Sequence, residues 1–509
     1  MRSIQEINDP QILKQVAIIL ERENTKLHAK LHEFANELAR LRGDTFPTAQ
    51  QELTFLKELL ALRERALFGA SSEQRPRAEA TESGPPPAPR RGHGPTVQPR
   101  LPIIERVHEL DAADRTCPQC GGTLQEMKGQ TEDSEEITVI ERQFVIVKHE
   151  RQKYRCACNG CVDTAPGPLR LAARADVRGH RYAPAFAVEV ALDKYLDHLP
   201  LERQARRMHR EGLTIDSQTL WDQLEALATV LQPTYEAVRQ YVLTAPVIGA
   251  DETWWRFLQG RGAQRWWAWS VTREDAVAYT ILESRSQHAA RQVLNGYAGI
   301  VIADGYGAYD ALARAGPGFT LAHCWAHVRR KFVEAEPHYP GPCGEILDLI
   351  GQLYAVERGC PVLGVTASEE TRAEMLRLRA TARREQSIAI VDTIHAWAFR
   401  QRALPESSAG KAIAYMLGLW PGLTRFLDDA RIPLDNNATE RGLRGMVIGR
   451  KNHYGSRSKR GTEVAALFYS LIETAKLAGV NPKIYLLEAT HAALLNPGTA
   501  LLPPALPTS

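Results

Sequence analysis

Apolar residues repeat every seven positions through residues 12–42. One position of this heptad holds Leu13, Leu20, Leu27, Phe34 and Leu41, and the other holds Ala17, Asn24, Leu31 and Leu38. A single Asn at such a core position is typical of dimeric coiled coils, whose register it fixes. A second apolar-periodic stretch contains Leu53, Leu56, Leu59, Leu60 and Leu67. We therefore predict coiled-coil, leucine-zipper-like helices over residues 1–72 and self-association into a homodimer or a higher assembly. The alternative is a helix that packs on its own domain.

The apolar pattern stops at residues 73–102, which hold 8 of the 30 prolines and almost no large apolar side chain. Such a segment cannot bury enough surface to order itself, so it predicts a disordered linker. Periodicity returns at residues 137–140 and 143–147, where short β-branched runs predict two strands. These strands lie inside a small region, residues 103–170, that is rich in cysteine.

Five of the eight cysteines gather in that region, namely Cys117, Cys120, Cys156, Cys158 and Cys161. Cys117 and Cys120 have the spacing of a zinc knuckle, and two glycines follow them. A four-thiolate site needs two ligands from the second group, and both Cys158 with Cys161 and Cys156 with Cys161 are feasible. We predict one structural Zn²⁺ bound by four of the five, because clustering of this kind is not typical of buried free thiols.

Residues 171–240 have a helical apolar pattern interrupted at Gly212. The helix before the glycine carries Arg203, Arg206 and Arg207, and Thr214–Ser217 supplies N-cap chemistry for the next helix. This is the outline of a helix-turn-helix, whose basic first helix would contact DNA phosphates. An ordinary helical hairpin has the same outline and stays open as the alternative.

Apolar runs at 246–253, 266–271, 277–281 and 299–306 predict strands, and residues 287–294 predict a helix. The first and last of these strands end in Asp251 and Asp304. Strands of an α/β sheet place ligands at their carboxyl ends, so we expect the two acids to meet there.

A third acid, Glu440, opens a predicted helix far along the chain. The following residues 441–460 contain seven basic side chains and no acid, a strong field for a polyanion. These bases are Arg441, Arg444, Arg450, Lys451, Arg457, Lys459 and Arg460. Two Asp and one Glu can hold two Mg²⁺ about 4 Å apart for phosphodiester chemistry.

Each acid also has a plainer interpretation. Asp251 could cap a strand while Glu252 is the ligand, and Asp304 could belong to a turn. Glu440 stands three residues after Asn437, the spacing of a capping box. Taken together, the acids and the basic helix favour the metal site.

Cys324 and His327 have metal-ligand spacing, but no other pair nearby completes a zinc site, so we favour a packed thiol and a hydrogen-bonded imidazole. The bases that follow are phosphate contacts or a solvated helix face: Arg329, Arg330 and Lys331.

The sequence resembles DDE transposases of the insertion sequence 66 family over nearly its whole length. The most specific segments are 250–253 (ADET), 304–309 (DGYGAY), 436–441 (NNATER) and 470–476 (SLIETAK). The resemblance implies a ribonuclease-H-like catalytic fold over residues 241–470, with Asp251, Asp304 and Glu440 as its triad. It also implies a helical insertion at about residues 330–430, a C-terminal helix and tail over residues 471–509, and accessory proteins of the same element. The second cysteine group departs from the family's usual Cys-x-x-Cys, so the fourth zinc ligand stays open.

The expected fold class is thus multi-domain and mainly α/β, with an N-terminal coiled coil and a small zinc-binding domain. The 509-residue chain has a net charge of +3, no apolar run of membrane-spanning length and an acidic N-terminal segment, so we expect a cytoplasmic protein without a membrane role. The expected function is metal-dependent cleavage of double-stranded DNA at element ends and strand transfer into target DNA. A stand-alone nuclease of the same fold, or a captured transposase acting as a DNA-binding regulator, is the alternative.

Overall fold

The computed structural model describes residues 51, 53–61, 119, 121, 143–155, 161–171, 181–259, 262–315, 318–361 and 367–504. The predicted heptad at 12–42, the linker at 73–102 and four of the five clustered cysteines lie outside these ranges. The chain divides into two units, one made of Met1–Ser71 with Phe144–Ser509 and the other of Ser72–Gln143. The elements below belong to the first unit.

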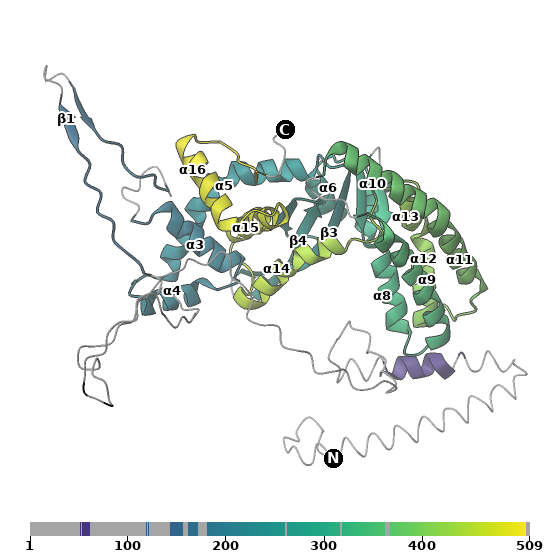
Figure 1. The fold of residues 1–509 in the computed structure, drawn as a ribbon. Helices are drawn as coiled ribbons and strands as arrows, with labels where there is room; N and C mark the ends of the chain where they lie inside the picture. The colour runs from purple at the N-terminus through teal and green to yellow at the C-terminus, as the bar shows by residue number, and fades with distance from the viewer. Residues whose placement is uncertain are drawn as a thin grey trace, which may run out of the picture. The chain divides into compact units, whose positions relative to one another are not determined.

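A mixed sheet that includes β3 and β4 forms the centre of this unit (Figure 1). It has five strands in the order β5-β4-β3-β6-β7. Its strands are β3 (Val247–Gln259), β4 (Gly262–Thr272), β5 (Val277–Leu282), β6 (Ile300–Ala303) and β7 (Thr320–His323). The first three form an antiparallel meander, whereas β6 pairs in parallel with both β3 and β7. The strands predicted from the apolar runs are confirmed.

Short helices link the strands. The predicted helix over residues 287–294 is present as α6 (Gln287–Leu294), which the Ser286 side chain caps and Asn295 ends in the left-handed conformation. α6 leads to β6, and α7 (Gly307–Arg314) leads from β6 to β7. Both parallel connections therefore contain a helix, as parallel strands require.

The edge strand β5 is covered by α15 (Lys459–Leu477). The hydroxyl of Ser470 accepts a hydrogen bond from the Tyr279 backbone N–H, and the Thr474 hydroxyl bonds both the N–H and the carbonyl of Val277. An open sheet edge presents unpaired backbone groups, and these two side chains satisfy several of them. Ser470 and Thr474 of the 470–476 segment therefore stabilise the edge of the sheet.

Within the described residues 181–246, three helices precede the sheet: α3 (Pro184–Tyr195), α4 (Leu201–Arg210) and α5 (Ser217–Val242). The predicted break is present at Gly212, whose φ is +85°, and the Asp216 side chain caps α5 by accepting from the Thr219 N–H. Buried side chains of α3 and α5 share one hydrophobic core with the sheet, with α15 and with α16 (Pro482–Leu495). The helices on either side of Gly212 are therefore packed into the body that carries the sheet.

A second core lies among the helices that follow β7. They are α8 (Trp325–Ala335), α9 (Pro340–Gly359), α10 (Glu369–Ala382), a π-helical turn (Arg383–Ser387), α11 (Ile388–Arg400), α12 (Ser408–Gly418) and α13 (Trp420–Thr424). A short 3₁₀ turn (Arg425–Leu427) follows, and α14 (Asn437–His453) then returns to the sheet. The described residues between 330 and 430 are mostly helical, as expected for the helical insertion at about residues 330–430.

The fully buried Arg383 ties this helical segment together. Its guanidinium pairs with Glu357 and donates to the main-chain carbonyls of Phe426 and Ile432. A buried cation is tolerated only when its donors are satisfied in this way.

Residues 53–61 form a helix, as their apolar period predicts. Leu53 is buried, whereas Leu56 and Leu59 are each 41% exposed. The carboxylate of the buried Glu58 accepts the backbone N–H of Ser408 at the first turn of α12. A carboxylate at this place complements the positive end of the helix dipole.

The strand predicted at residues 143–147 is wrong. The structure has no strand at 143–150, and Val145, Ile146 and Val147 are all exposed. An apolar run becomes a strand only when a partner pairs with its backbone, and here the pairing occurs later, between β1 (Lys153–Arg155) and β2 (Val162–Thr164). Among the helices described, none has the length and hydropathy needed to cross a membrane.

Candidate active site

Asp251 and Asp304 stand level with each other on adjacent parallel strands. Gly249 of β3 pairs with Ile302 of β6, and each Asp follows its partner residue by two positions. Asp304 comes directly after β6, as predicted. The sheet register therefore brings the two predicted acids to the same edge of the parallel pair.

The prediction that Asp251 ends its strand is wrong, because β3 continues to Gln259. What ends near Asp251 is the parallel pairing with β6, while the antiparallel pairing with β4 continues along the rest of β3. The apolar run in the sequence therefore ends where β3 loses its parallel neighbour β6, and not where β3 itself ends.

Glu440 lies in the first turn of α14, next to β3. Asn436, the residue before this helix, donates from its side chain to the Ala250 carbonyl at 2.9 Å, and its own carbonyl accepts the Glu440 N–H at 3.2 Å. A Cβ at Gly249 would collide with the side chains of Thr439 and Asn436, so glycine permits this close approach. The helix start is thereby held against the residue that precedes Asp251.

The acidic side chains at this edge of the sheet influence the pKa of Asp251. Burial raises the pKa of Asp251 to about 8, and the carboxylates of Glu252, Asp304 and Glu440 add to the rise. Of the basic side chains in the described ranges, none forms an ion pair with Asp251 or Asp304. Like charges held together without a cation are costly, so the arrangement is one that a bound cation would stabilise.

Glu252 is engaged elsewhere. Its buried carboxylate accepts from Arg285 at 2.6 Å and from the Tyr309 hydroxyl at 2.8 Å. The Arg285 guanidinium also stacks on the Tyr306 ring, with its carbon 3.7 Å from the ring centroid. Of the two neighbouring acids, Asp251 rather than Glu252 is left available for a ligand.

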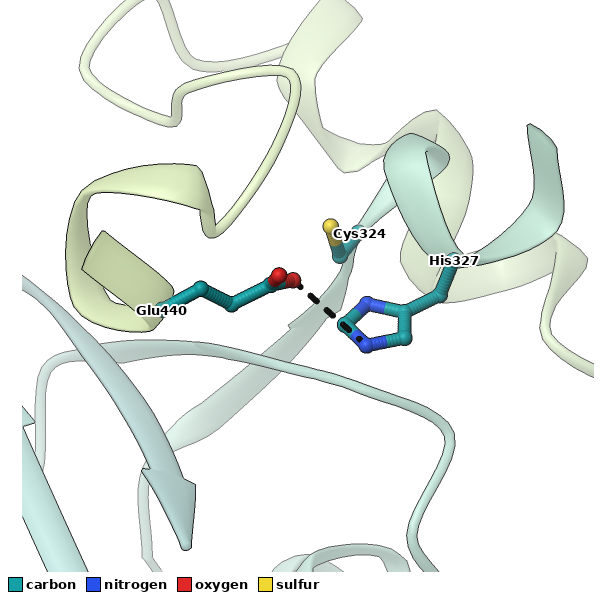
Figure 2. Close-up of side chains that lie close together, drawn as sticks. All are labelled: Cys324, His327 and Glu440. Carbon is teal, nitrogen blue, oxygen red and sulfur yellow. Dashed lines mark ion pairs between the residues drawn. The ribbon is translucent and has the colours of Figure 1, made fainter. Parts of the chain in front are cut away.

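Glu440 also faces α8. One carboxylate oxygen lies 3.5 Å from Nε2 of His327 and the other lies 3.3 Å from Arg330. Cys324 comes to the same place, and the ligand atoms of Cys324, His327 and Glu440 all lie within 4.8 Å of one another (Figure 2). The sequence paired Cys324 with His327 by spacing but gave no signal that Glu440 would join them.

Five of the seven bases after Glu440 divide into two groups. Arg441, Arg444 and Lys451 are exposed, and their spacing of three and seven residues places them on one face of α14. Arg457 is exposed in the segment after the helix. Arg450, by contrast, is 8% exposed, stacks on Trp254 and donates to the Trp254 carbonyl and the Thr253 hydroxyl. This geometry gives Arg450 a packing role and does not support its predicted contact with DNA.

Two other basic groups were predicted to contact DNA. In α4, Arg203 and Arg206 are exposed and border a surface cavity together with Arg207 and Arg210. Arg207 is also paired with Asp193. In α8, Arg329 and Lys331 are exposed, and Arg330 is turned toward Glu440.

The predicted zinc ligands are mostly outside the described residues. Cys161 is described and exposed, one residue before β2. Cys117, Cys120, Cys156 and Cys158 fall in ranges that the structure does not describe.

Sequence reasoning missed three contributors to the site. Asn436, Arg285 and Tyr309 each hold a segment that carries one of the acids. A single sequence marks Asn436 only as part of a helix start, and nothing in it links Arg285 to Glu252, 33 residues earlier.

Comparison with known proteins defines the class. The family model described as "Transposase IS66 family" matches residues 179–464, a range that includes Asp251, Asp304 and Glu440. A second, the "zinc-finger binding domain of transposase IS66", matches residues 114–159. The chain carries a transposase domain preceded by a zinc-finger domain. It belongs to the IS66 transposase family, as its motifs predict.

Three relatives come from Sinorhizobium fredii (strain NBRC 101917 / NGR234), and each is described as uncharacterized. Protein y4jD is 31% identical over 416 residues, which cover 78% of this chain and 77% of the relative. Protein y4hP is 28% identical over 80% of this chain and 76% of its own length. Protein y4qI is 28% identical over 93% of this chain and 92% of its own length. Membership of the family implies transposase activity and binding to DNA.

Proposed function

We propose that this protein is a DDE transposase that cleaves DNA at the ends of its element and joins the freed end to target DNA. The observation that carries the proposal is that Asp251, Asp304 and Glu440 lie at one edge of the sheet, where burial and, after it, the nearby acids raise the pKa of Asp251. In the first step, a water oxygen attacks a phosphorus and the bond to the 3′-oxygen breaks. In the second, that 3′-hydroxyl attacks a target phosphodiester and displaces another 3′-oxygen.

The three carboxylates fit a pair of hard divalent cations. Their donors are all oxygens, as Mg²⁺ prefers, and the backbone N–H groups of Glu252 and Tyr306 each occupy only one oxygen of Asp251 and Asp304. When bound, two Mg²⁺ would supply an activated oxygen nucleophile and stabilise the leaving oxygen. The chain's own part is to hold the three acids in place through the register of β3 and β6 and through Asn436.

The sheet order supports a ribonuclease-H-like core. An antiparallel meander of three strands is joined on one side by two parallel strands. Asp251 lies on the central strand, and Asp304 directly follows the strand next to it. We propose a catalytic domain over residues 241–470, with the helices from α9 to α13 as its insertion. The shared hydrophobic core links α3 and α5 to the same body, so the proposed DNA-binding helices move with the catalytic sheet.

The proposed DNA path follows the exposed bases. Arg441, Arg444 and Lys451 extend along α14 from Glu440, and exposed Arg203, Arg206, Arg329, Lys331 and Arg457 add further phosphate contacts. Phosphate contacts of this kind position the duplex without reading its sequence. The zinc-finger match covers Cys117, Cys120, Cys156 and Cys158, which supports structural Zn²⁺ binding by four of the five clustered cysteines.

We further propose that the N-terminal heptad joins two or more copies of the chain at the paired element ends, with accessory proteins of the same element. Because the substrate is the cell's DNA, the activity belongs in the cytoplasm.

The test uses DNA that carries this gene's own flanks, purified full-length protein and Mg²⁺ or Mn²⁺. The 3′-ends are mapped at nucleotide resolution for the wild type, for Asp304→Asn and for Asp348→Asn, an exposed acid of α9 that serves as the matched control. Defined nicks at the flanks, absent only in Asp304→Asn, support the proposal. Cleavage by Asp304→Asn would overturn the triad. Scattered cutting by the wild type would favour a plain nuclease, and specific binding without cutting, even with the neighbouring gene products added, would favour a regulator.

A further inference from the structure

The side chains of Cys324, His327 and Glu440 lie close together (Figure 2) and place a sulfur, a nitrogen and an oxygen atom within 4.8 Å of one another. Cys324 is the N-cap of α8, His327 lies in the first turn of that helix, and Glu440 reaches across from the first turn of α14. The proposed cleavage chemistry uses only Glu440 of these three, so the thiol and the imidazole have no task in it.

We propose that these three side chains form a Zn²⁺ site that shares Glu440 with the site of the three carboxylates. A thiolate, an imidazole and a carboxylate are the ligands that Zn²⁺ takes in proteins, and a water would complete its tetrahedron. Mg²⁺, which prefers oxygen ligands, would not select the Cys and His donors. The two overlapping sites therefore differ in the metal that each selects.

The separations suit a tetrahedral ion. Ligand atoms around Zn²⁺ lie about 3.5 Å apart, since each is about 2.0–2.3 Å from the metal. His327 Nε2 and Glu440 Oε1 are already 3.5 Å apart, and all three ligand atoms lie within 4.8 Å. Side-chain movements of about 1 Å would close the site around the ion.

Burial and unmet hydrogen bonds point to a ligand. Cys324 is 1% exposed, and Oε1 of Glu440 is buried without a hydrogen-bond partner among the described residues. His327 Nδ1 is likewise buried and unpartnered within the described ranges, so the ring can turn either nitrogen toward an ion. A buried polar atom without a partner is costly, and a metal ion would satisfy the carboxylate oxygen.

The surroundings of Cys324 suit a metal-bound thiolate. Its Sγ accepts the backbone N–H of Asn436 at 3.2 Å, and it lies at the positive end of α8. Without a metal, burial raises the pKa of this thiol to about 12, although the backbone N–H groups of Asn436 and His327 oppose the rise. Zn²⁺ binding would therefore release the thiol proton.

Zinc in this site would hold Glu440 away from the other two acids. We therefore expect Zn²⁺ to inhibit Mg²⁺-dependent DNA cleavage, a consequence that rests on the proposed function. The binding itself does not, because the ligand atoms converge whatever reaction the protein performs.

The binding test compares the zinc content of full-length wild type, Cys324→Ser and Cys343→Ser after equilibration with Zn²⁺ and gel filtration. Cys343 is an equally buried thiol in α9, outside the cluster, and is the matched control. Wild type and Cys343→Ser should hold one zinc ion more per chain than Cys324→Ser, whatever the zinc finger binds. Equal zinc in all three would overturn the site.

A second measurement tests the same site with a variant whose result does not depend on the folding of Cys324→Ser. His327→Gln removes a partly exposed ligand and should weaken binding of the same ion by roughly 100-fold or more, because even indirect perturbation of a metal site costs 10–100-fold. With the zinc finger already filled by Zn²⁺, added Co²⁺ should give a thiolate charge-transfer band in wild type and Cys343→Ser only. A band that persists in Cys324→Ser would contradict the assignment.

The inhibition test measures cleavage in Mg²⁺ with increasing Zn²⁺, relative to the zinc-free rate of each protein. Zinc should inhibit wild type at concentrations at least 10-fold lower than those needed for Cys324→Ser. Equal inhibition of the two would reject the regulatory consequence. If wild type does not cleave at all, the proposed function fails while the zinc count still decides the site.

Discussion

The side-chain amide of Asn436 donates a 2.9 Å hydrogen bond to the main-chain carbonyl of Ala250, the residue before Asp251. The backbone N–H of Asn436 donates to Cys324 at the start of α8, and its carbonyl accepts the N–H of Glu440. One buried residue therefore joins β3, α8 and α14, the three segments that carry Asp251, Cys324 and Glu440. The position of Glu440 relative to the sheet depends on this connection.

Replacing Asn436 with Ala should reduce cleavage by about 100-fold, because a displacement of the order of 1 Å at a catalytic group has that effect. The free energy of unfolding should fall by only about 1–3 kcal/mol, the cost of leaving the Ala250 carbonyl without its donor. Cleavage kinetics and chemical denaturation measure the two effects. Asn452→Ala is the matched control, since that side chain bonds only the Ile448 carbonyl of its own helix. Equal losses in both variants would remove Asn436 from its positioning role.

The raised pKa of Asp251 predicts how stability depends on pH. The carboxyl has a pKa of about 8 in the folded chain and an ordinary value of 3.8 when unfolded. Between these values the folded protein keeps a proton that the unfolded chain has lost, so the free energy of unfolding falls as the pH rises through this window. Asn cannot ionise, and Asp251→Asn should therefore melt at a higher temperature than wild type, with a larger difference at pH 8 than at pH 5.

Thermal unfolding at these two pH values, without added divalent ions, tests this expectation. Asp348→Asn should show no such pH-dependent difference, because that carboxylate is exposed on α9. Added Mg²⁺ should raise the melting temperature of wild type but not that of Asp251→Asn, since a ligand that binds only the folded state stabilises it. A variant that is less stable than wild type at pH 8 would contradict the raised pKa.

Glu252 should matter for stability rather than for metal binding. Glu252→Ala leaves Arg285 and the Tyr309 hydroxyl without their buried acceptor and should lower the free energy of unfolding by about 3 kcal/mol. Glu252→Gln should cost less, because its amide oxygen can still accept from Tyr309. Denaturation measures both costs, and the Mg²⁺-induced rise in melting temperature should persist in Glu252→Gln. Loss of that rise would make Glu252, not Asp251, the ligand.

The sequence predicts the parts of this site that depend on local pattern. The apolar runs locate β3 and β6, and the acids that follow them identify Asp251 and Asp304, because strand periodicity is set by neighbouring residues. The helix over residues 287–294, α6, is predicted for the same reason. The sequence also predicts a helix start near Glu440, but the capping box expected between Asn437 and Glu440 is wrong, because α14 begins after Asn436 and no side chain caps it.

Contacts between distant segments were not predictable from one sequence. The convergence of Cys324, His327 and Glu440 depends on how α8 and α14 pack, over a separation of more than 110 residues. Arg450 has the positive charge expected of a DNA contact, but it is buried against Trp254, because a long cationic side chain can lie along an aromatic face. The strand expected at 143–147 is absent for a similar reason, since strand pairing depends on partner segments that the apolar run itself does not reveal.

The two kinds of arginine on α14 should respond differently to substitution. Arg444→Ala should weaken binding to all DNA sequences about equally and reduce the slope of log affinity against log salt by about 1, because it removes one phosphate contact. Arg450→Ala should instead destabilise the fold, because its guanidinium stacks on Trp254 and bonds the backbone of β3. DNA binding across a salt series, with thermal unfolding of both variants, separates the effects. An unchanged salt slope in Arg444→Ala would show that this face of α14 does not contact DNA.

The covering of β5 by α15 predicts a stability effect away from the site. Thr474→Val removes the hydroxyl that bonds both the N–H and the carbonyl of Val277, and the loss of these buried partners should cost about 1–3 kcal/mol. Thr490→Val is the matched control, because that equally buried hydroxyl bonds only the Leu486 carbonyl of its own helix, which keeps its helical partner. Chemical denaturation should show the larger loss for Thr474→Val, while the cleavage rate of the folded protein stays the same in both. If the two variants lose equal stability, the Thr474 hydroxyl is not a required cover for the sheet edge, and apolar packing of α15 alone protects β5.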